Sequence, residues 1–413
     1  MILRARAVLP ISAPPIANGA VVIAGGRIVE VGPWNTLRRT PGQVTDLGEV
    51  LVMPGLVNAH CHLDYTHMAG QFEPPRVFSD WLKDITSTKA GWTLVDYTES
   101  WRAGAQMLLR TGTTTVADIE AVPPLLPGVW DMTPLRVISF LELIGITGRR
   151  PPQAVLREAL EKIESVRHSR HRVALSPHAP YSTVPELLRL SARAARRKKT
   201  LLCTHVAESR LEYEMFTKGR GAMYDWLQRS GRDMSDCGIG SPVRHLERCG
   251  LMSPRLVVAH ANYLGPGDAV LLAKHGVSVA HCPRSHAYFR HGRFPARRVL
   301  RAGVNLCLGT DSLATVQRVR GTSLDLNMFK EMQVLAEREP WLSPRRVVQM
   351  ATLNGARALG MCGRLGELKP GTQADLIAFP FAGKLSRLYD AVLEQKGDIA
   401  CSLIDGRWAK PPS

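Results

Sequence analysis

Short apolar runs alternate with longer segments of helical periodicity through most of the chain. Eight of these runs have the length and composition of buried strands, and they are residues 52–58, 113–117, 135–141, 172–175, 200–204, 255–259, 277–280 and 304–308. Between them, Ala and Leu recur at helical spacing among Arg and Glu, as in 155–166 and 185–196. Strands that alternate with helices form parallel sheets, so eight such units predict an α/β fold with a closed (β/α)8 barrel of the TIM type.

The two ends of the chain have a different pattern, in which short β-type runs are broken by turns. The runs are 20–24 and 27–31 around Gly25-Gly26, and 374–379 and 400–404, the last one before Asp405-Gly406. Because chain termini often lie close together, we expect both ends to form one small β-sandwich domain. The predicted division is 1–52 for its N-terminal part, 53–362 for the barrel and 363–413 for its C-terminal part.

Length and hydropathy agree with this division. A chain of 413 residues fits a barrel of roughly 250 residues plus a smaller unit. No apolar run approaches the roughly 18 to 20 residues of a membrane helix, so no membrane association is expected. The apolar stretch 7–24 follows Arg4 and Arg6, but prolines interrupt it, which predicts mature sequence and not a signal peptide.

Charge and cysteine content narrow the possible partners. The formal charge is +17, but the basic residues are dispersed and no recognised nucleic-acid motif accompanies them, so no nucleic-acid partner is expected. The eight cysteines are far apart and include no C-x-x-C, which argues against a disulfide framework and against a thiolate zinc site. Reduced thiols of this kind indicate a cytoplasmic location.

Polar residues follow the predicted barrel strands at the ends where barrel enzymes place their chemistry. They are His60 and His62, Ser176 to His178, His205 with Glu208, His260, His281, and Asp311 with Ser312. Any one histidine alone would more often be a buried structural residue. Their joint occurrence after six separate strands indicates a functional site.

The same residues predict one metal site. Side chains alternate along a strand, so His60 and His62 point the same way and can bind one ion. His205 and Asp311 would complete the site. Three imidazoles and one carboxylate suit a single divalent ion, Zn first and Fe(II) second, and leave a position for a water molecule whose pKa the metal lowers.

These motifs resemble a known family. The segment 54–62 is similar to the strand-one metal motif of the amidohydrolase superfamily, and 205–208, 260–262 and 309–312 are similar to later motifs of its mononuclear deaminase and chlorohydrolase branch. Residues 363–366 and 369–378 resemble the segment in which the chain of that family leaves the barrel and re-enters the small β domain. The resemblance therefore covers nearly the whole chain. It implies a homodimer that acts on a small-molecule substrate.

The resemblance also implies roles for single residues. The expected metal ligands are His60, His62, His205 and Asp311. Glu208 would protonate the substrate nitrogen, Asp311 would also take a proton from the attacking water, His260 would orient or polarise the group under attack, and His178 would contact substrate. Strand four ends in Ser176-Pro177-His178 where binuclear members carry a bridging Lys or Glu, so one metal is expected.

Finer motifs bear on the substrate. The segments 78–82, 140–145 and 281–286 resemble the aminodeoxyfutalosine deaminase-like subgroup, which is related to adenosine and S-adenosylhomocysteine deaminases. The implied activity is hydrolytic deamination of an amino-substituted heterocycle, an adenine nucleoside such as 6-aminodeoxyfutalosine, with release of ammonia.

Two alternatives stay open. Many nucleoside-type relatives carry Asn-Pro-x-Ser-Asn where this chain has 281–286, so hydrolysis of a C–N or C–Cl bond of a triazine-like molecule is the second hypothesis. A non-catalytic relative is the third, but such a protein would have lost a ligand or Glu208, and none is missing.

Further substrate contacts are predicted with an alternative for each. Arg284 begins a cationic loop, 284–293, that would pair with a substrate carboxylate unless its arginines are ordinary surface residues. Trp81 would stack on an aromatic base, or it would pack in the protein core as part of a helix. Glu142 would bind a sugar hydroxyl or ring amine, or form a structural ion pair, and Ser312 would contact substrate beside Asp311.

Overall fold

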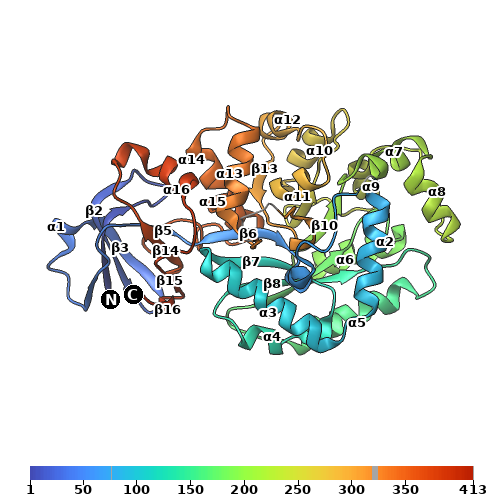
Figure 1. Cartoon of the computed structure of the whole chain (residues 1–413). Helices are drawn as coiled ribbons and strands as arrows, with labels where there is room; N and C mark the ends of the chain where they lie inside the picture. The colour runs from blue at the N-terminus through green and yellow to red at the C-terminus, as the bar shows by residue number, and fades with distance from the viewer. Residues whose placement is uncertain (76, 319–323, 413) are drawn as a thin grey trace.

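Eight parallel strands form a barrel in the computed structural model, which describes residues 1–75, 77–318 and 324–412 (Figure 1). Hydrogen bonds connect them in the order β13-β12-β11-β10-β9-β8-β7-β6. Asp311, just beyond β13, pairs in parallel with Cys61 of β6 and closes the barrel. The strands are β6 (Leu56–Cys61), β7 (Thr113–Glu120), β8 (Arg136–Leu143), β9 (Arg172–Pro177), β10 (Leu202–Val206), β11 (Leu256–His260), β12 (Ser278–His281) and β13 (Asn305–Leu308).

The predicted barrel is confirmed, with one correction at its first strand. The prediction of a single strand over 52–58 is wrong. This run is divided between β5 (Val50–Pro54), which belongs to a second sheet, and β6 of the barrel. The break is at Gly55, where a Cβ atom would lie 2.1 Å from Thr114 Oγ1. The other seven strands are confirmed, with ends that differ by at most three residues.

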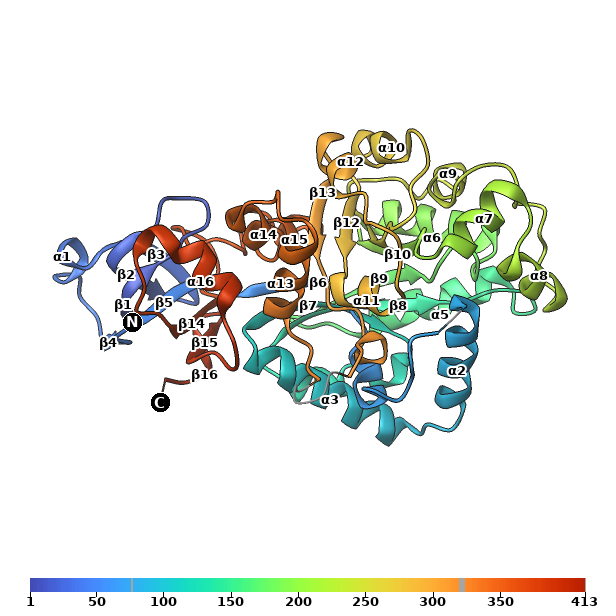
Figure 2. The same cartoon turned by 45° about the horizontal axis from the view of Figure 1, so that its top comes forward.

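Helices cover the outside of the barrel (Figures 1 and 2). In α6 (Pro185–Lys198), for example, Leu187, Leu188 and Ala192 are buried, whereas Arg193 and Arg197 are exposed, as expected for an amphipathic helix on a sheet. The other barrel helices are α2 (Phe78–Ala90), α3 (Leu94–Arg110), α4 (Gly128–Asp131), α5 (Pro152–Ser165), α7 (Arg210–Lys218), α8 (Ala222–Arg229), α9 (Pro242–Arg248), α10 (Asp268–Lys274), α11 (Pro283–Tyr288), α12 (Ala296–Arg301), α13 (Met328–Arg338), α14 (Pro344–Met350) and α15 (Leu353–Ala358).

Both chain ends build the second sheet, as predicted. Its order is β16-β15-β14-β5-β1-β2-β3, with β4 beside β1. The predicted turns are present, since Gly25 and Gly26 have φ of 56° and 75°, and Asp405 and Gly406 have φ of 51° and 71°. The elements are β1 (Ile2–Val8), β2 (Ile16–Ala24), β3 (Arg27–Pro33), α1 (Trp34–Leu37), β4 (Val44–Asp46), β5, β14 (Leu376–Pro380), α16 (Leu388–Glu394), β15 (Cys401–Ile404) and β16 (Arg407–Lys410).

A buried ion network joins the two units. Arg136, the first residue of β8, pairs with Asp375 at 3.2 Å between Nη2 and Oδ1, and also with Asp405. Arg136 lies at the amino-terminal end of its strand, so the small sheet contacts the barrel face opposite the strands' carboxyl ends. All eight cysteines are free thiols, and none of the helices in the described ranges is long and apolar enough to span a bilayer.

Candidate metal centre and active site

The four predicted metal ligands lie together at the carboxyl ends of β6, β10 and β13. His60 is in β6, His62 follows it, and His205 is in β10. The Nε2 atoms of His62 and His205 are 3.2 Å apart. Asp311 Oδ1 lies 3.8 Å from His60 Nε2 and 3.7 Å from His62 Nε2. The barrel therefore brings together residues that are up to 251 positions apart in the chain, from His60 to Asp311.

Backbone and hydroxyl groups fix the position of Asp311. A Cβ atom at Gly309 would lie 2.6 Å from the carbonyl oxygen of His60, so only glycine lets this segment approach β6 closely. Asp311 itself has a left-handed backbone with φ of 53°, a strained conformation of the kind found at functional sites. Ser285 and Thr315 donate their hydroxyl groups to Asp311 Oδ2 at 2.6 and 3.2 Å, which leaves Oδ1 toward the histidines.

The histidines present lone pairs to the centre of the cluster. Nδ1 of His205 donates to the carbonyl oxygen of His178 at 2.9 Å, so its Nε2 is an acceptor. Burial and neighbouring imidazoles lower the pKa of His60 well below its usual value and that of His205 to about 3, so both rings are neutral. His60 Nε2 is buried without a hydrogen-bond partner among the described residues.

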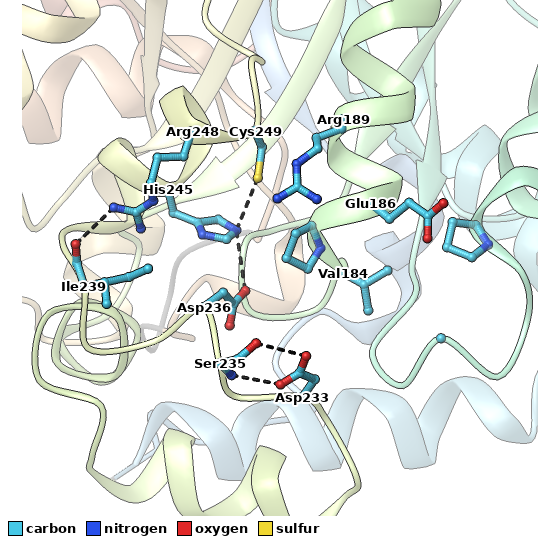
Figure 3. Close-up of a pocket in the computed structure, with 13 residues that line it drawn as sticks. Val184, Glu186, Arg189, Asp233, Ser235, Asp236, Ile239, His245, Arg248 and Cys249 are labelled. Carbon is cyan, nitrogen blue, oxygen red and sulfur yellow. Dashed lines mark hydrogen bonds and ion pairs between the residues drawn. The ribbon is translucent and has the colours of Figure 1, made fainter.

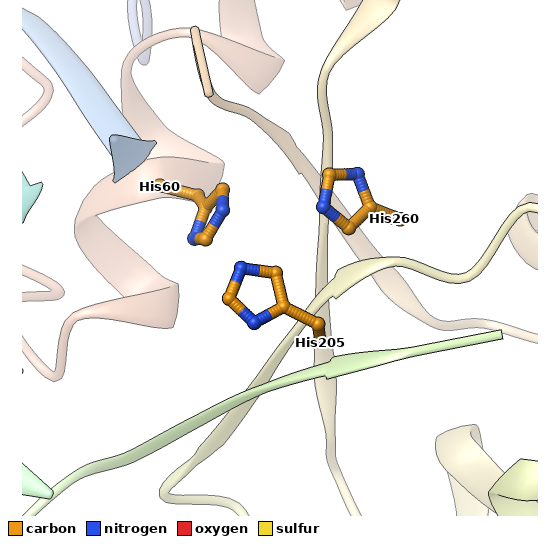
Figure 4. A group of neighbouring side chains, drawn as sticks. All are labelled: His60, His205 and His260. Atoms are coloured by element: carbon orange, nitrogen blue, oxygen red, sulfur yellow. The ribbon is translucent and has the colours of Figure 1, made fainter. Parts of the chain in front are cut away.

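This arrangement fits a divalent metal ion. Nitrogen and oxygen ligands lie about 2.0 to 2.2 Å from Zn²⁺ in a tetrahedron, which sets neighbouring ligand atoms roughly 3.4 Å apart. Three distances within the set, 3.2 Å from His62 to His205 and 3.8 and 3.7 Å from Asp311 to His60 and His62, are close to that spacing. Bound metal would also satisfy the unpartnered nitrogen of His60. Figure 4 shows the rings of His60, His205 and His260 turned toward one another.

Glu208 and His260 lie beside the proposed metal ligands and are buried as well. Ala207, with φ of 51°, turns the chain after β10, and His260 ends β11 with φ of 71°. Glu208 Oε1 lies 3.7 Å from His260 Nε2. Burial, and next the charge of Asp311, raise the pKa of Glu208 well above its usual value, so Glu208 can hold a proton at neutral pH.

A cavity of about 50 Å³ opens on this cluster, and three predicted substrate residues, Trp81, His178 and Ser312, line it. Trp81 Nε1 and Ser312 Oγ are buried and have no hydrogen-bond partner in the ranges that the structure describes. Glu142 lies behind His178, with 3.8 Å between Glu142 Oε1 and His178 Nε2, and its side chain is only 5% exposed. The remaining lining residues are His62, Tyr65, Leu82, Ile85, Tyr181, His205, Glu208, His260 and Asp311.

The prediction for Arg284 requires a correction. Its guanidinium is only 9% exposed and pairs with the buried carboxylate of Glu331, while Nη2 donates to the carbonyl oxygen of Asp325 at 2.8 Å. Arg284 is not among the residues that line the cavity. A charge already neutralised inside the protein is not available to a substrate carboxylate, so Arg284 is structural and not part of a cationic rim.

Four lining residues were missed from the sequence, namely Tyr65, Leu82, Ile85 and Tyr181. Tyr65 stacks on His62, with ring centroids 5.0 Å apart and an angle of 14° between the rings. Tyr65 and Tyr181 each come three residues after a predicted site histidine, so the rule that chemistry follows strand ends could have found them. Leu82 and Ile85 share the helix of Trp81 and would require knowledge of where that helix packs.

A larger cavity of about 590 Å³ lies elsewhere, between α6 and α9 (Figure 3). It contains His245, whose Nε2 lies 3.6 Å from Asp236 Oδ2 and 3.7 Å from Cys249 Sγ. None of the predicted ligands or catalytic residues lines it. The chemistry is therefore located by the strand-end residues and not by cavity size.

Comparisons with known proteins agree with the geometry. Residues 51–409 match the model of the Amidohydrolase family, and residues 19–40 that of an Imidazolonepropionase-like composite domain, bacteria. A 5-methylthioadenosine/S-adenosylhomocysteine deaminase of Syntrophobacter fumaroxidans is 33% identical over 385 residues, which cover 88% of this chain and 80% of that protein.

Two solved structures extend the comparison to the fold. An adenosine deaminase of Xanthomonas campestris with bound zinc has a TM-score of 0.83 and 26% identity, covering 98% of this chain and 92% of that one. An atrazine chlorohydrolase of Arthrobacter aurescens in complex with zinc has a TM-score of 0.83 at 23% identity, and the match covers 98% of this chain and 94% of that one. At this identity the likeness shows a shared fold.

Proposed function

The chain belongs to the amidohydrolase family, and from this premise we propose that it is a metal-dependent hydrolytic deaminase of an adenine nucleoside. The observation that supports the chemistry is the grouping of Glu208, His260 and Asp311, whose oxygen and nitrogen atoms lie within 4.8 Å of one another beside the metal ligands. The relative that is 33% identical supports the choice of an adenine nucleoside.

The proposed metal site consists of His60, His62, His205 and Asp311, with Zn as the first candidate and Fe(II) as the second. A metal ion bound there supplies a Lewis acid that lowers the pKa of water toward neutrality. The imidazole nitrogens are held neutral by burial, which prepares them as ligands before any ion binds.

Proton transfer is assigned to two carboxyl groups. Water attacks the ring carbon that bears the amino group and gives one proton to the carboxylate of Asp311, while Glu208 donates a proton to the adjacent ring nitrogen. In the second step the remaining hydroxyl proton passes to Glu208 as the carbon–oxygen double bond forms. The proton held by Asp311 passes to the amino group, the carbon–nitrogen bond breaks, and ammonia leaves. His260 Nε2, 3.7 Å from Glu208 Oε1, orients the group under attack.

Substrate binding is assigned to Trp81, His178, Ser312 and Glu142. Trp81 Nε1 and Ser312 Oγ have no hydrogen-bond partner within the described residues. Trp81 Nε1 can donate to polar atoms of the base, and Ser312 Oγ can donate to them or accept from them. His178 is fixed by a hydrogen bond of 2.5 Å between its Nδ1 and Ser182 Oγ. Glu142 lies behind His178 and is not among the lining residues, so its proposed contribution to substrate binding is through His178, whose Nε2 lies 3.8 Å from Glu142 Oε1.

A second candidate is hydrolysis of a C–Cl or C–N bond in a triazine-like molecule. The same metal ligands and Glu208 would serve this reaction, because it too needs an activated water and an acid for a ring nitrogen. The fold shared with the atrazine chlorohydrolase supports this second candidate function.

The deciding experiment measures ammonia and chloride release by the purified, zinc-loaded protein. The panel contains adenosine, 5′-methylthioadenosine, S-adenosylhomocysteine, aminodeoxyfutalosine, melamine and atrazine. We expect ammonia from at least one adenine nucleoside. Chloride from atrazine, or ammonia from melamine alone, would instead support the second candidate. No turnover at one bound metal per chain would contradict both.

A further inference from the structure

The active-site cavity is too small for the proposed substrates. Its volume is about 50 Å³, whereas sites for small molecules usually enclose roughly 300 to 1,000 Å³. An adenine nucleoside cannot enter without displacing part of the wall. The described structure is therefore a closed state, and at least one lining element has to move.

One helix differs from the rest of the wall. Nine lining residues are in barrel strands or within six residues of a strand end, where backbone hydrogen bonds fix them. The other three, Trp81, Leu82 and Ile85, all come from α2, which begins 17 residues after the end of β6. Figures 1 and 2 both show α2 on the part of the barrel distant from the small sheet.

The two faces of α2 are unlike. Asp80, Lys83, Asp84, Thr86 and Ser87 are exposed. The opposite face is apolar and covers the cavity. The helix thus packs on the protein mainly through its inner face, over the space that a substrate would occupy. On the exposed face, Lys83 Nζ lies 6.0 Å from the centre of the Trp226 ring in α8.

Contacts near each end of α2 hold this face in place. Near its start, the rings of Phe78 and Trp81 each lie 5.1 Å from that of Phe289 in edge-on geometry. Near its end, Lys89 Nζ lies 2.7 Å from the phenolic oxygen of Tyr65, which lines the cavity and stacks on His62. Lys89 therefore connects the helix to the tyrosine beside a proposed metal ligand.

Lys89 also compensates buried negative charge. Burial by itself would lower the pKa of Lys89, but Tyr65, Glu142 and Asp64 act in the opposite direction and raise it above its usual value. Both carboxylate oxygens of Asp64 are buried without a hydrogen-bond partner in the parts of the chain described. Burial raises the pKa of Asp64 well above its usual value, and the ammonium of Lys89 opposes this rise. Withdrawal of α2 would remove this cation from the buried carboxyl group and from the Tyr65 hydroxyl group, which favours the closed position.

We propose that α2 is a movable cover of the active-site cavity and that Lys89, by binding Tyr65, fastens it in the closed position. Lys89 is then a positioning residue, which acts on substrate through Tyr65 and through the placement of Trp81. Covers of this kind at the carboxyl ends of barrel strands exclude water during the reaction. Only the choice of substrate in the kinetic test below rests on the proposed function.

Hydrogen exchange of the zinc-loaded protein tests the cover without any substrate. In Lys89→Met we expect the amides of residues 78–90 to exchange at least about tenfold faster than in the wild type, while those of 202–206 in β10 are unchanged. Lys83→Met is the control for the loss of a lysine from the same helix, because Lys83 is on the exposed face, where it pairs with Asp80 and lies 6.0 Å from the centre of the Trp226 ring. Equal exchange of α2 in wild type, Lys89→Met and Lys83→Met would overturn the proposal.

Two further variants keep the test decisive if Lys89→Met loses its fold. Lys89→Arg retains the cation and is expected to restore slow exchange of α2. Tyr65→Phe removes only the hydroxyl group and is expected to accelerate exchange of α2 as Lys89→Met does. Slow exchange in Tyr65→Phe would show that the pair does not fasten the helix.

Kinetics then separate this proposal from the proposed function. With a nucleoside that the wild type deaminates, Lys89→Met is expected to raise KM by about tenfold and to change kcat by a smaller factor, because closure contributes to binding. Lys89→Arg should recover most of the loss. An unchanged KM in Lys89→Met would count against the cover, whereas a wild type inactive on every nucleoside would refute the proposed function and leave the exchange result to decide on α2.

Discussion

Among single residues, Glu208 has the surroundings of a buried general acid. Replacing it with Gln removes the transferable proton but not a metal ligand, so kcat should fall by about 10²- to 10⁴-fold at unchanged metal content. Ammonia release and metal analysis of the same sample measure both quantities. Glu214→Gln is the control, because Glu214 pairs with Lys218 at the surface. An active, fully metallated Glu208→Gln variant would contradict the assignment of Glu208 as the proton donor.

Gly309 affects the metal site because its missing side chain leaves room for the backbone of β6. A methyl group in Gly309→Ala would meet the carbonyl oxygen of His60 at 2.6 Å, so β6 or the segment that carries Asp311 has to shift. We expect metal affinity to fall by at least about tenfold, since ligands displaced by a few tenths of an ångström bind poorly. Competition with a fluorescent zinc chelator measures the affinity. Gly292→Ala, where a Cβ atom meets nothing within 4 Å, is the control.

At the scale of elements, Arg284 joins α11 to α13. In Arg284→Met the carboxylate of Glu331 would stay buried without its partner, so the free energy of unfolding should decrease by about 3 to 5 kcal/mol in urea titrations. The double variant Arg284→Met/Glu331→Met should recover much of this loss. Binding of carboxylated and neutral substrates should be affected alike, and a selective rise in KM for carboxylated substrates would support the predicted pairing of Arg284 with a substrate carboxylate.

Packing of α9 against the segment around Asp236 makes stability depend on pH. Burial lowers the pKa of His245 to about 4, with Arg248, Arg232 and Arg189 acting in the same direction and Asp236 opposing them. The unfolded chain binds this proton near pH 6.5. The neutral ring therefore stabilises the fold fully above pH 6.5, and the contribution is lost as the pH falls from 6.5 to 4.

The variant His245→Gln should be less sensitive to acid for this reason. Between pH 7 and pH 4 the wild type is expected to lose about 3 kcal/mol more of its unfolding free energy than the variant. Urea titrations of both proteins across this range measure the difference. Parallel pH profiles would show that His245 is not the titrating group.

For the whole molecule, Arg136 connects the barrel to the small sheet. Its guanidinium and the carboxylate of Asp375 are each only 3% exposed, so Arg136→Met would leave a buried charge unpaired. The free energy of unfolding is expected to fall by about 3 to 5 kcal/mol. Arg4→Met, at a pair with Asp46 that is partly exposed, should cost less than about 1 kcal/mol, and urea titrations compare the two. Equal effects would contradict the role of this network.

The barrel could be predicted because its signals are local. Apolar runs such as 113–117 need only a buried strand's composition, and the turns at Gly25-Gly26 and Asp405-Gly406 need only residues that tolerate positive φ. The first strand was misjudged because Val52 and Leu56 are equally apolar, although one belongs to the small sheet and the other to the barrel. Composition does not distinguish two sheets that share one continuous run.

The sequence by itself determined the barrel, the second unit from both ends and the grouping of His60, His62, His205 and Asp311, because strand alternation and strand ends follow from short-range pattern. Only the tertiary structure decided that Arg284 faces Glu331 and not substrate, and that α2 closes the cavity with Lys89 against Tyr65. Such pairings depend on how distant elements pack, and many partners along a chain satisfy the same charge and hydropathy.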